Sequence, residues 1–490
     1  MEMGLEDLGD LALNAIISKL DAKDTVAVSC VSKKLRVSAS EESLWLNHCS
    51  QDLGLSSPID PLGKPAPSFK ETYRLWRESF GMYPWPLVKW VKRCWDRLKN
   101  WLSANFPEAD ATLRKGATEV EIEALQNILK VKLPLPTRLL YRFCDGQELN
   151  EEGVGGTALG CSLGIIGGYC FNDHLVNVCF LPLRQVILET REITDQIVFS
   201  TTSKYVIVAA SSTDIGKFFF LNCTTGQLYV GTRGLVSAGE MIPCVPNALI
   251  SPMHDVNTGQ QQDAMLLWLE EHVRRLQNGI IKLRKEGMIR SINLFPEEAP
   301  LCSTAVTNGV QVRASAVFIP EGCNLLDASH KYLFAFSIRM RLLPEGCIVN
   351  GTSFGSCQLN WRHWIIRAND HVVSDVNGEA VIGKYPLLYP GGEEFVYQSC
   401  TLLSSSQGSI EGGFTFVPGS TICIQKCILL MHYLFPICFS DWQTQKAVHL
   451  RLKWAGFLSS VQTTFSNVTI QEGKSLEYQQ HSSALLSSRC

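Results

Sequence analysis

The sequence predicts three folded parts in series: an all-α N-terminal part, a central α+β part, and a C-terminal all-β sandwich with an atypical tail. In the first part, apolar residues recur at helical spacing from Leu5 to His48. Helical patterns are followed by strand patterns and a final helix within residues 85–285. From Leu301 the apolar period changes to two, which is typical of strands with one buried face. A chain of 490 residues is also too long for one core, and about 150 residues per domain gives about three domains.

Changes in composition mark the boundaries between these parts. Pro58, Pro61, Pro65 and Pro67 lie among Gly and Ser residues, a pattern that indicates a linker. We therefore expect the first domain at 1–50, a linker at 51–84, the central domain at 85–285, a second linker at 286–300, the sandwich at 301–420, and at 421–490 an atypical tail, with disorder as one alternative.

Charge and cysteine content limit the class of protein. Lys plus Arg is 44 and Asp plus Glu is 47, so the net charge of -3 gives no electrostatic case for nucleic acid or for an anionic membrane. We expect proteins or small ligands as partners. The 18 cysteines form no tight framework and the N-terminus has no signal-peptide pattern, which predicts reduced thiols in the cytosol or nucleus. The apolar run from Cys427 to Phe439 is too short to span a membrane.

The first fifty residues predict three short amphipathic helices that suit docking on a partner. Asp24 is the expected N-cap of the second helix, because its side chain can accept from a free amide of the turn that follows. We expect the docking contacts from ten residues of the apolar stripe: Leu5, Leu8, Ile16, Ile17, Leu20, Val26, Cys30, Val31, Leu44 and Trp45.

This stripe resembles an F-box. Gly9 and Leu35 stand where the family usually has a proline and an aromatic residue. The resemblance implies binding to a Skp-type adaptor and, through it, to a cullin and a RING subunit. The alternative is the ordinary three-helix start of a globular domain, because periodicity alone does not separate the two. The matching positions are Leu5 to Leu8, Ile16 to Leu20, Asp24, Val26, Ser29 to Lys34, Leu44 and Trp45.

The central part predicts four helices and a small sheet. Pro86 fits the first turn of a long helix, and Thr118 with Glu121 has the spacing of a capping box. The other predicted elements are a helix from Thr137 to Phe143, strands from Tyr205 to Ala210, Lys217 to Leu221 and Gln227 to Thr232, and a helix from Asp263 that ends at Asn278 and Gly279.

The run from Leu133 to Gly146, in this order of elements, resembles the Smi/Knr-like domains of the SUKH superfamily. Such domains are usually protein-binding modules, so the resemblance implies a binding role for residues 85–285. We find no nucleophile, base and orienting group close together along this part of the sequence, which argues against an enzyme.

The C-terminal part alternates apolar and polar residues from Val310 to Phe318 and from Tyr332 to Leu342. The runs from Gln358 to Ile366, Val376 to Pro386 and Gly408 to Phe416 resemble ApaG. This resemblance implies an immunoglobulin-like or fibronectin-like sandwich.

With these three parts in this order, the chain is similar to the plant Skp-interacting F-box proteins that carry an ApaG domain. The resemblance implies the substrate-recognition subunit of a Skp, cullin and F-box (SCF) ubiquitin ligase, without catalysis or a cofactor of its own. Its protein substrate is unknown. The alternative function is binding of a phosphate or nucleotide ligand through ApaG, or a scaffold unconnected with ubiquitin.

Two features of the ApaG-like part raise the question of ligand chemistry. Gly378 and Gly383 lie where the family often has a glycine-rich loop, but Ala380 replaces the middle glycine and no helix follows, so a plain turn is the alternative to a phosphate site. His363 shares an expected strand face with Leu359 and Trp361, which favours a half-buried histidine over a ligand contact. No metal site is expected, because the spacing of Cys423, Cys427, His432 and Cys438 fits no zinc motif.

The tail contains one strictly alternating segment, from Val448 to Trp454. It is able to supply the closing strand that an ApaG sandwich needs, since an open sheet edge promotes self-association. We expect it to stay unpaired, because the run before it resembles no ApaG loop.

Overall fold

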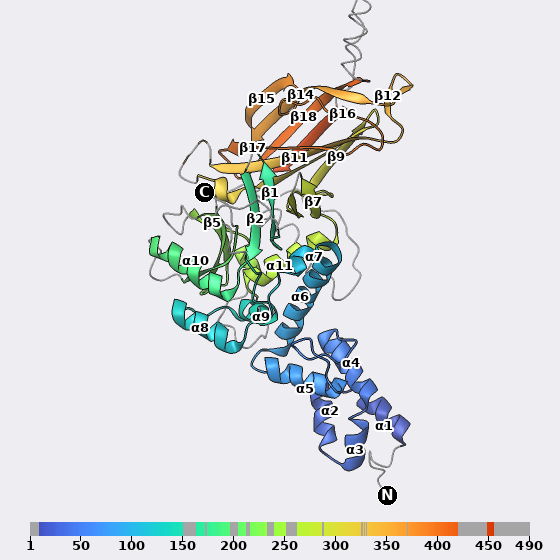
Figure 1. The fold of residues 1–490 in the computed structure, drawn as a ribbon, viewed down its shortest axis with the longest axis vertical. Coiled ribbons are helices and arrows are strands. Elements are labelled where there is room, and N and C mark those ends of the chain that lie inside the picture. The colour runs from blue at the N-terminus through green and yellow to red at the C-terminus, as the bar shows by residue number, and fades with distance from the viewer. Residues whose placement is uncertain are drawn as a thin grey trace, which may run out of the picture.

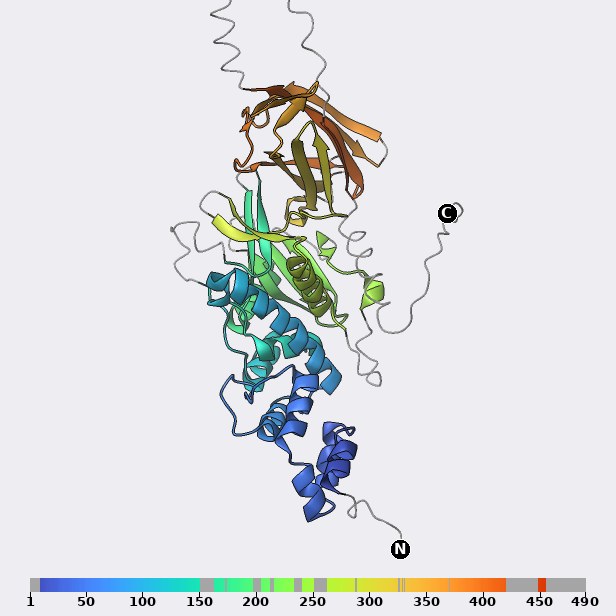
Figure 2. The same ribbon diagram turned by 90° about the vertical axis from the view of Figure 1, so that its right-hand side faces the viewer.

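The computed structural model shows an elongated molecule in which the N-terminal helices and the C-terminal sandwich lie at opposite ends of a central domain (Figures 1 and 2). One large hydrophobic core extends from Ala22 and Trp45, through the central domain, to Ile319 and Ala335 of the sandwich. The three parts are therefore packed on one another. The structure describes residues 9–149, 163–171, 174–196, 204–211, 216–232, 240–250, 262–286, 289–324, 327, 329, 331–369, 371–419 and 448–454.

The N-terminal part contains four helices rather than three. Asp21, and not Asp24, caps α2, because the Asp21 carboxylate accepts from the Asp24 amide at 2.7 Å. Ser32 caps α3 in the same way, and Gly54, with φ at +66°, ends α4. The helices are α1 (Asp10–Ile17), α2 (Ala22–Ser29), α3 (Lys33–Ser38) and α4 (Glu42–Leu53).

The predicted linker at 51–84 is wrong, because it contains the helix α5 (Phe69–Phe80). Tyr73, Trp76 and Phe80 recur at helical spacing and are buried in the large core. The Trp76 indole also donates to the carbonyl of Ile59 at 3.0 Å, which fastens the proline-containing loop to the helix. The prolines thus mark only the loop before α5.

The central helices confirm most of the predicted elements. Thr118 and Glu121 form the predicted capping box. Asp263 is fully buried at the start of α11, where it accepts from the Leu266 amide and from the amide and hydroxyl of Thr137. The helices are α6 (Trp85–Asn105), α7 (Pro107–Asp110), α8 (Glu119–Leu129), α9 (Leu135–Phe143), α10 (Leu183–Gln196) and α11 (Ala264–Gln277).

These helices pack with an eight-stranded sheet in the order β6-β5-β4-β3-β2-β1-β8-β7. The pairs are antiparallel except β1 with β8. The second predicted linker, 286–300, is wrong because it contributes β8 and the fully buried Ile292 and Phe295. The strands are β1 (Gly167–Phe171), β2 (His174–Phe180), β3 (Tyr205–Ser211), β4 (Lys217–Asn222), β5 (Leu228–Thr232), β6 (Ile242–Pro243), β7 (Lys282–Glu286) and β8 (Ile289–Asn293).

The C-terminal part is the predicted all-β sandwich. One sheet has the order β17-β11-β10-β9, and the other has β15-β14-β18-β19 with β16 beside β14. The rings of Trp364 and Phe414 pack edge to face in the core between the two sheets, with their centroids 5.1 Å apart. The strands are β9 (Cys302–Thr307), β10 (Val310–Phe318), β11 (Tyr332–Leu342), β12 (Cys347–Val349), β13 (Thr352–Phe354), β14 (Cys357–Ala368), β15 (His371–Glu379), β16 (Leu387–Leu388), β17 (Phe395–Leu403), β18 (Gly408–Pro418) and β19 (Val448–Trp454).

The expectation that Val448–Trp454 stays unpaired is wrong. This segment is β19, and it pairs antiparallel with β18 along its whole length, from Phe414↔Val448 to Gly408↔Trp454. The physical reason is that β18 otherwise presents a row of open backbone donors and acceptors, which an alternating strand satisfies. The expected tail at 421–447 and 455–490, with the apolar run from Cys427 to Phe439, lies outside the described residues. Among the helices that the structure describes, none has the length and apolarity needed to cross a membrane.

Candidate functional site

The four N-terminal helices divide the predicted docking residues into two groups. Ile17, Leu44 and Trp45 are buried, at 2%, 7% and 2% exposure. Ile17 and Leu44 join Leu13 and Leu35 in a small core, so they stabilise the helices rather than meet a partner. Leu5 and Leu8 lie outside the described residues, and Leu20 is half-buried.

The exposed group consists of apolar residues with no packing partner in the small core. Ile16, Val26 and Val31 are 44%, 48% and 72% exposed, and Cys30 is exposed beside them in sequence. The structure adds Leu11 on α1 and Val37 on α3, at 89% and 69% exposure. Leu11 belongs to the apolar stripe, but neither residue is among the ten expected docking residues. The sequence signal for both residues is an apolar side chain two positions from a buried leucine, Leu13 on α1 and Leu35 on α3, and so on the opposite side of a short helix. We call Leu11, Ile16, Val26, Val31 and Val37 the exposed apolar set.

Trp45 connects these helices to the rest of the molecule. Its indole donates to the carbonyl of Ala39 at 2.8 Å, and its ring contacts Tyr73 of α5. Next to it, buried His48 lies 3.2 Å from the hydroxyl of Thr25, and burial lowers the pKa of His48. The N-terminal helices are therefore fixed to the central body through α4 and α5.

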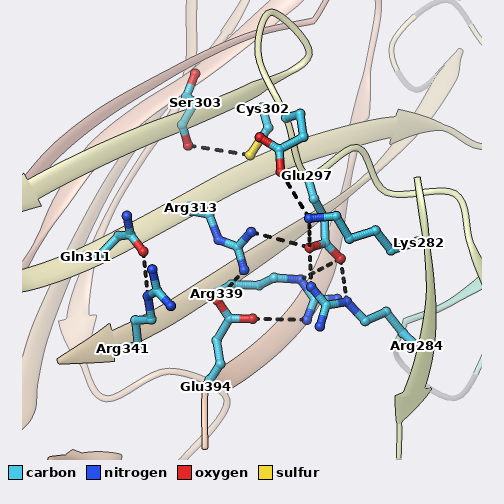
Figure 3. A network of polar contacts seen from close by, with 11 residues as sticks. Lys282, Arg284, Glu297, Cys302, Ser303, Gln311, Arg313, Arg339, Arg341 and Glu394 are labelled. Carbon is cyan, nitrogen blue, oxygen red and sulfur yellow. Dashed lines mark hydrogen bonds and ion pairs between the residues drawn. The ribbon is translucent and has the colours of Figure 1, made fainter. Parts of the chain in front are cut away.

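Two buried charge clusters join the central domain to the sandwich, and neither was predicted. The first is centred on Glu297, whose side chain is 2% exposed. Its carboxylate accepts from both Arg284 of β7 and Arg313 of β10, and lies 3.7 Å from Arg339 of β11 (Figure 3). Burial opposes the charge of Glu297, but the three arginines outweigh it and lower the pKa of this carboxyl.

Glu394, before β17, completes this first cluster. It accepts from Arg313 at 2.5 Å and from Arg339 at 3.5 Å, so Arg313 bridges Glu394 and Glu297 (Figure 3). Arg284 comes from the central sheet, whereas Arg313, Arg339 and Glu394 come from the sandwich. Glu297, in the segment between the two domains, thus links side chains of both.

The second cluster surrounds Glu321, which lies on the short helix η5 (Pro320–Gly322) of the sandwich and has a fully buried side chain. Three central-domain residues meet its carboxylate. The hydroxyl of Tyr169 donates to it, His174 Nε2 lies 3.3 Å away, and Lys217 Nζ lies 3.7 Å away. Burial disfavours the charge of Glu321, but Lys217 and the two hydrogen-bond partners lower its pKa overall.

The loop that resembles a phosphate-binding segment is a tight turn. Val381 and Lys384 exchange backbone hydrogen bonds at 3.0 and 2.8 Å, and the Ala380 amide donates to the carbonyl of Asn360. The Arg362 guanidinium donates hydrogen bonds to the carbonyl oxygens of Glu379 and Ala380. The amides of Ala380, Val381 and Lys384 therefore bond within the protein rather than open toward a ligand. The geometry favours the plain turn.

His363 lies on the outer face of β14, where its Nε2 contacts the Asp375 carboxylate at 2.8 Å. It does not share a face with Leu359, because a bulge between Leu359 and Trp361 reverses the side-chain alternation. Leu359 is fully buried and Trp361 is 39% exposed as a result. The half-buried environment expected for His363 is present, but on the solvent side of the sheet.

The described residues offer no group of three or more His, Cys, Asp or Glu side chains arranged to hold a metal ion. The cysteines at 423, 427 and 438, with His432, lie outside them. The cysteines of the described part form no disulfide, and burial raises the pKa of Cys94, Cys144 and Cys244 to about 12. These three thiols are therefore protonated and unreactive at neutral pH.

Comparison with known proteins identifies both ends of the chain. An F-box domain model matches residues 5–47, and an ApaG domain model matches residues 324–418. The F-box protein SKIP16 of Arabidopsis thaliana is 60% identical over 85% of this chain and 94% of its own length. The chain is an F-box protein of this family.

More distant relatives match most of this chain or about a fifth of it. F-box only protein 3 of Homo sapiens is 25% identical over 84% of this F-box protein and 79% of its own length. Protein ApaG of Nitrosomonas europaea is 34% identical over 22% of this chain and 76% of its own length. Neither family model reaches residues 85–285, so the resemblance of this part to Smi/Knr-like domains stays a prediction.

Proposed function

We propose that this chain is the non-catalytic substrate-recognition subunit of an SCF ubiquitin ligase. In this proposal the F-box binds a Skp-type adaptor, which links the chain to a cullin and a RING subunit, and the rest of the chain captures a protein to be ubiquitinated and degraded. We also propose that the protein acts in the cytosol or the nucleus, where thiols stay reduced.

The observation that carries the proposal is the exposed apolar set. Its five members project from a small helical unit whose own core is already complete. Five exposed apolar residues within positions 11–37 are able to supply the apolar contacts of a docking surface. The elongated shape supports the same reading, because the F-box and the ApaG sandwich lie at opposite ends and are able to bind different partners (Figure 1).

The decisive experiment is a binding assay between a Skp-type adaptor and full-length protein. Val26→Lys combined with Val31→Lys should weaken binding at least about a hundredfold, because each valine contributes about 1.5 kcal/mol or more when buried at a docking face. The matched control is Leu62→Lys with Val120→Lys, two apolar residues of 73% and 75% exposure outside the F-box. All four sites are exposed, so the variants should fold. Equal adaptor binding by both double variants would contradict the proposal.

Ile17 is a poor choice for this test, because it is 2% exposed and supports the F-box core. Its replacement by Ala would weaken adaptor binding through unfolding as readily as through lost contact.

A thermal-shift assay with pyrophosphate examines the alternative of a phosphate ligand. Stabilisation by pyrophosphate, together with absent adaptor binding, would favour that alternative.

A further inference from the structure

In the part of the sandwich that the structure describes, the outer edge of β15 is an unprotected sheet edge. This strand pairs only with β14 among the residues that the structure describes, and it ends the sheet order β15-β14-β18-β19. Figures 1 and 2 show it on the outer side of the sandwich, away from the central domain. Val372 and Val373 are each 51% exposed, and Val376 is 36% exposed. A strand with open backbone groups and exposed valines is a template for another strand.

The edges of the other large sheets are protected among the residues that the structure describes. β7, at the end of the eight-stranded sheet, carries four charged residues among its five, and β6, at the opposite end, contains Pro243. β9 lies against β19, and β17 lies against β1 of the central domain. β15 has no Lys, Arg or Pro among its nine residues. Because Lys and Pro are the usual protection of an exposed edge, β15 differs from these edges, although it carries the two carboxylates Asp375 and Glu379.

The side chains of β15 define what fits beside it. On the outer face, Asp375 and Glu379 are exposed carboxylates, opposite Ile365 and Trp361 of β14. On the inner face, Val376 lies opposite Trp364 at the rim of the sandwich core. An added strand would thus meet acidic groups on one face and an apolar rim on the other. Residues of a strand alternate between faces, so the complementary strand alternates basic and apolar residues.

We propose that β15 captures an extended segment of a partner protein, with alternating basic and apolar residues, by adding it as a further strand of the sandwich. The inference rests on the proposed function, since the segment would belong to the protein that the ligase recognises. Backbone hydrogen bonds supply the affinity, and the contacts with Asp375, Glu379 and Val376 supply the selectivity.

The probe is a capped nine-residue peptide of alternating Val and Lys, with a Val and Glu peptide of equal length as its match. Fluorescence anisotropy with full-length protein should show preferential binding of the Val and Lys peptide, and hydrogen exchange should show new protection of β15. A version of the Val and Lys peptide that carries an N-methyl group on every residue has no backbone donor on either edge and should not bind. If it binds equally well, attraction between charges explains the result and strand addition is wrong.

Asp375→Lys tests the direction of the charge preference. It should weaken the Val and Lys peptide about three- to tenfold and strengthen the Val and Glu peptide, as expected for one exposed charge reversed. Glu345→Lys is the matched control, because Glu345 is also exposed and lies in the turn before β12, at the far side of the sandwich from β15 (Figure 1). At physiological salt a charge at that distance is screened. Equal effects of both variants would overturn the proposed site.

Two other occupants of the edge are outcomes of the same experiments. A stable dimer of the full-length protein with β15 protected before peptide is added would assign the edge to a second copy and overturn the proposal. If the hydrogen-exchange protection of β15 disappears when residues 455–490 are removed, the edge is covered by this chain itself, and the proposal is overturned. Adaptor binding is measured on the same samples. If the adaptor binds but the peptide does not, the ligase function stands and only the strand-addition proposal falls.

Discussion

Glu321→Gln should destabilise the junction between the central domain and the sandwich by about 3 kcal/mol. The substitution keeps the size of the side chain but removes the charge that faces Lys217, whose side chain is 7% exposed. Breaking a buried ion pair from one side costs about 3 to 5 kcal/mol, because the remaining charge is left uncompensated. The lower value applies here, since Lys217 keeps a 2.8 Å hydrogen bond to the Tyr169 hydroxyl and contacts with two aromatic rings.

Thermal unfolding of full-length protein measures this effect. A loss of about 3 kcal/mol should lower the Tm of the affected unit by roughly 6 to 12 °C, if that unit has 150 to 250 residues. Glu345→Gln, an exposed carboxyl of the same domain, should leave the Tm unchanged. Adding Lys217→Met to Glu321→Gln should recover part of the loss, because an apolar pair no longer buries an unpaired charge. A Tm for Glu321→Gln within 1 °C of the parent protein would refute the reasoning.

Three further outcomes are expected. The pKa of Glu321 is lowered from 4.5 by folding, so its charge stabilises the protein above about pH 4.5, and the Tm difference between parent and Glu321→Gln should shrink as pH falls below that value. Gly412→Ala should disrupt the pairing of β14 with β18, because a Cβ there would lie 1.9 Å from the carbonyl oxygen of His363; unchanged hydrogen exchange of β14 would contradict this. Truncation after Ser420 removes β19 and should increase hydrogen exchange along β18, whereas equal protection would show that β19 adds nothing to the sheet.

Local patterns in the sequence predicted the elements that depend on neighbours along the chain. The capping box at Thr118 and the strand β11 follow from residues a few positions apart, and the structure confirms both. The apolar stripe of the F-box was visible for the same reason. Its periodicity could not tell Ile17, which packs inward, from Ile16, which faces solvent, because adjacent positions of a short helix have equal apolar character.

The features that the sequence did not predict depend on contacts between distant residues. Glu297 was assigned to a linker, yet its partner Arg339 is 42 positions away and belongs to another domain. Tyr73 and Trp76 were overlooked because the prolines before them dominated the interpretation of that stretch. The outward direction of Trp361 depends on a single bulge, which has no signature in the alternation itself.

Under the proposed ligase function, the continuous core from Trp45 to Ala335 has a consequence for which lysines of a bound target are modified. A flexible connection would let a captured protein sample many positions around the ligase, with a local concentration that falls as the tether lengthens. A stiff body instead presents each captured protein in one orientation and at one separation from the F-box. Lysines that lie at this reach would be modified repeatedly, and others on the same target would be spared.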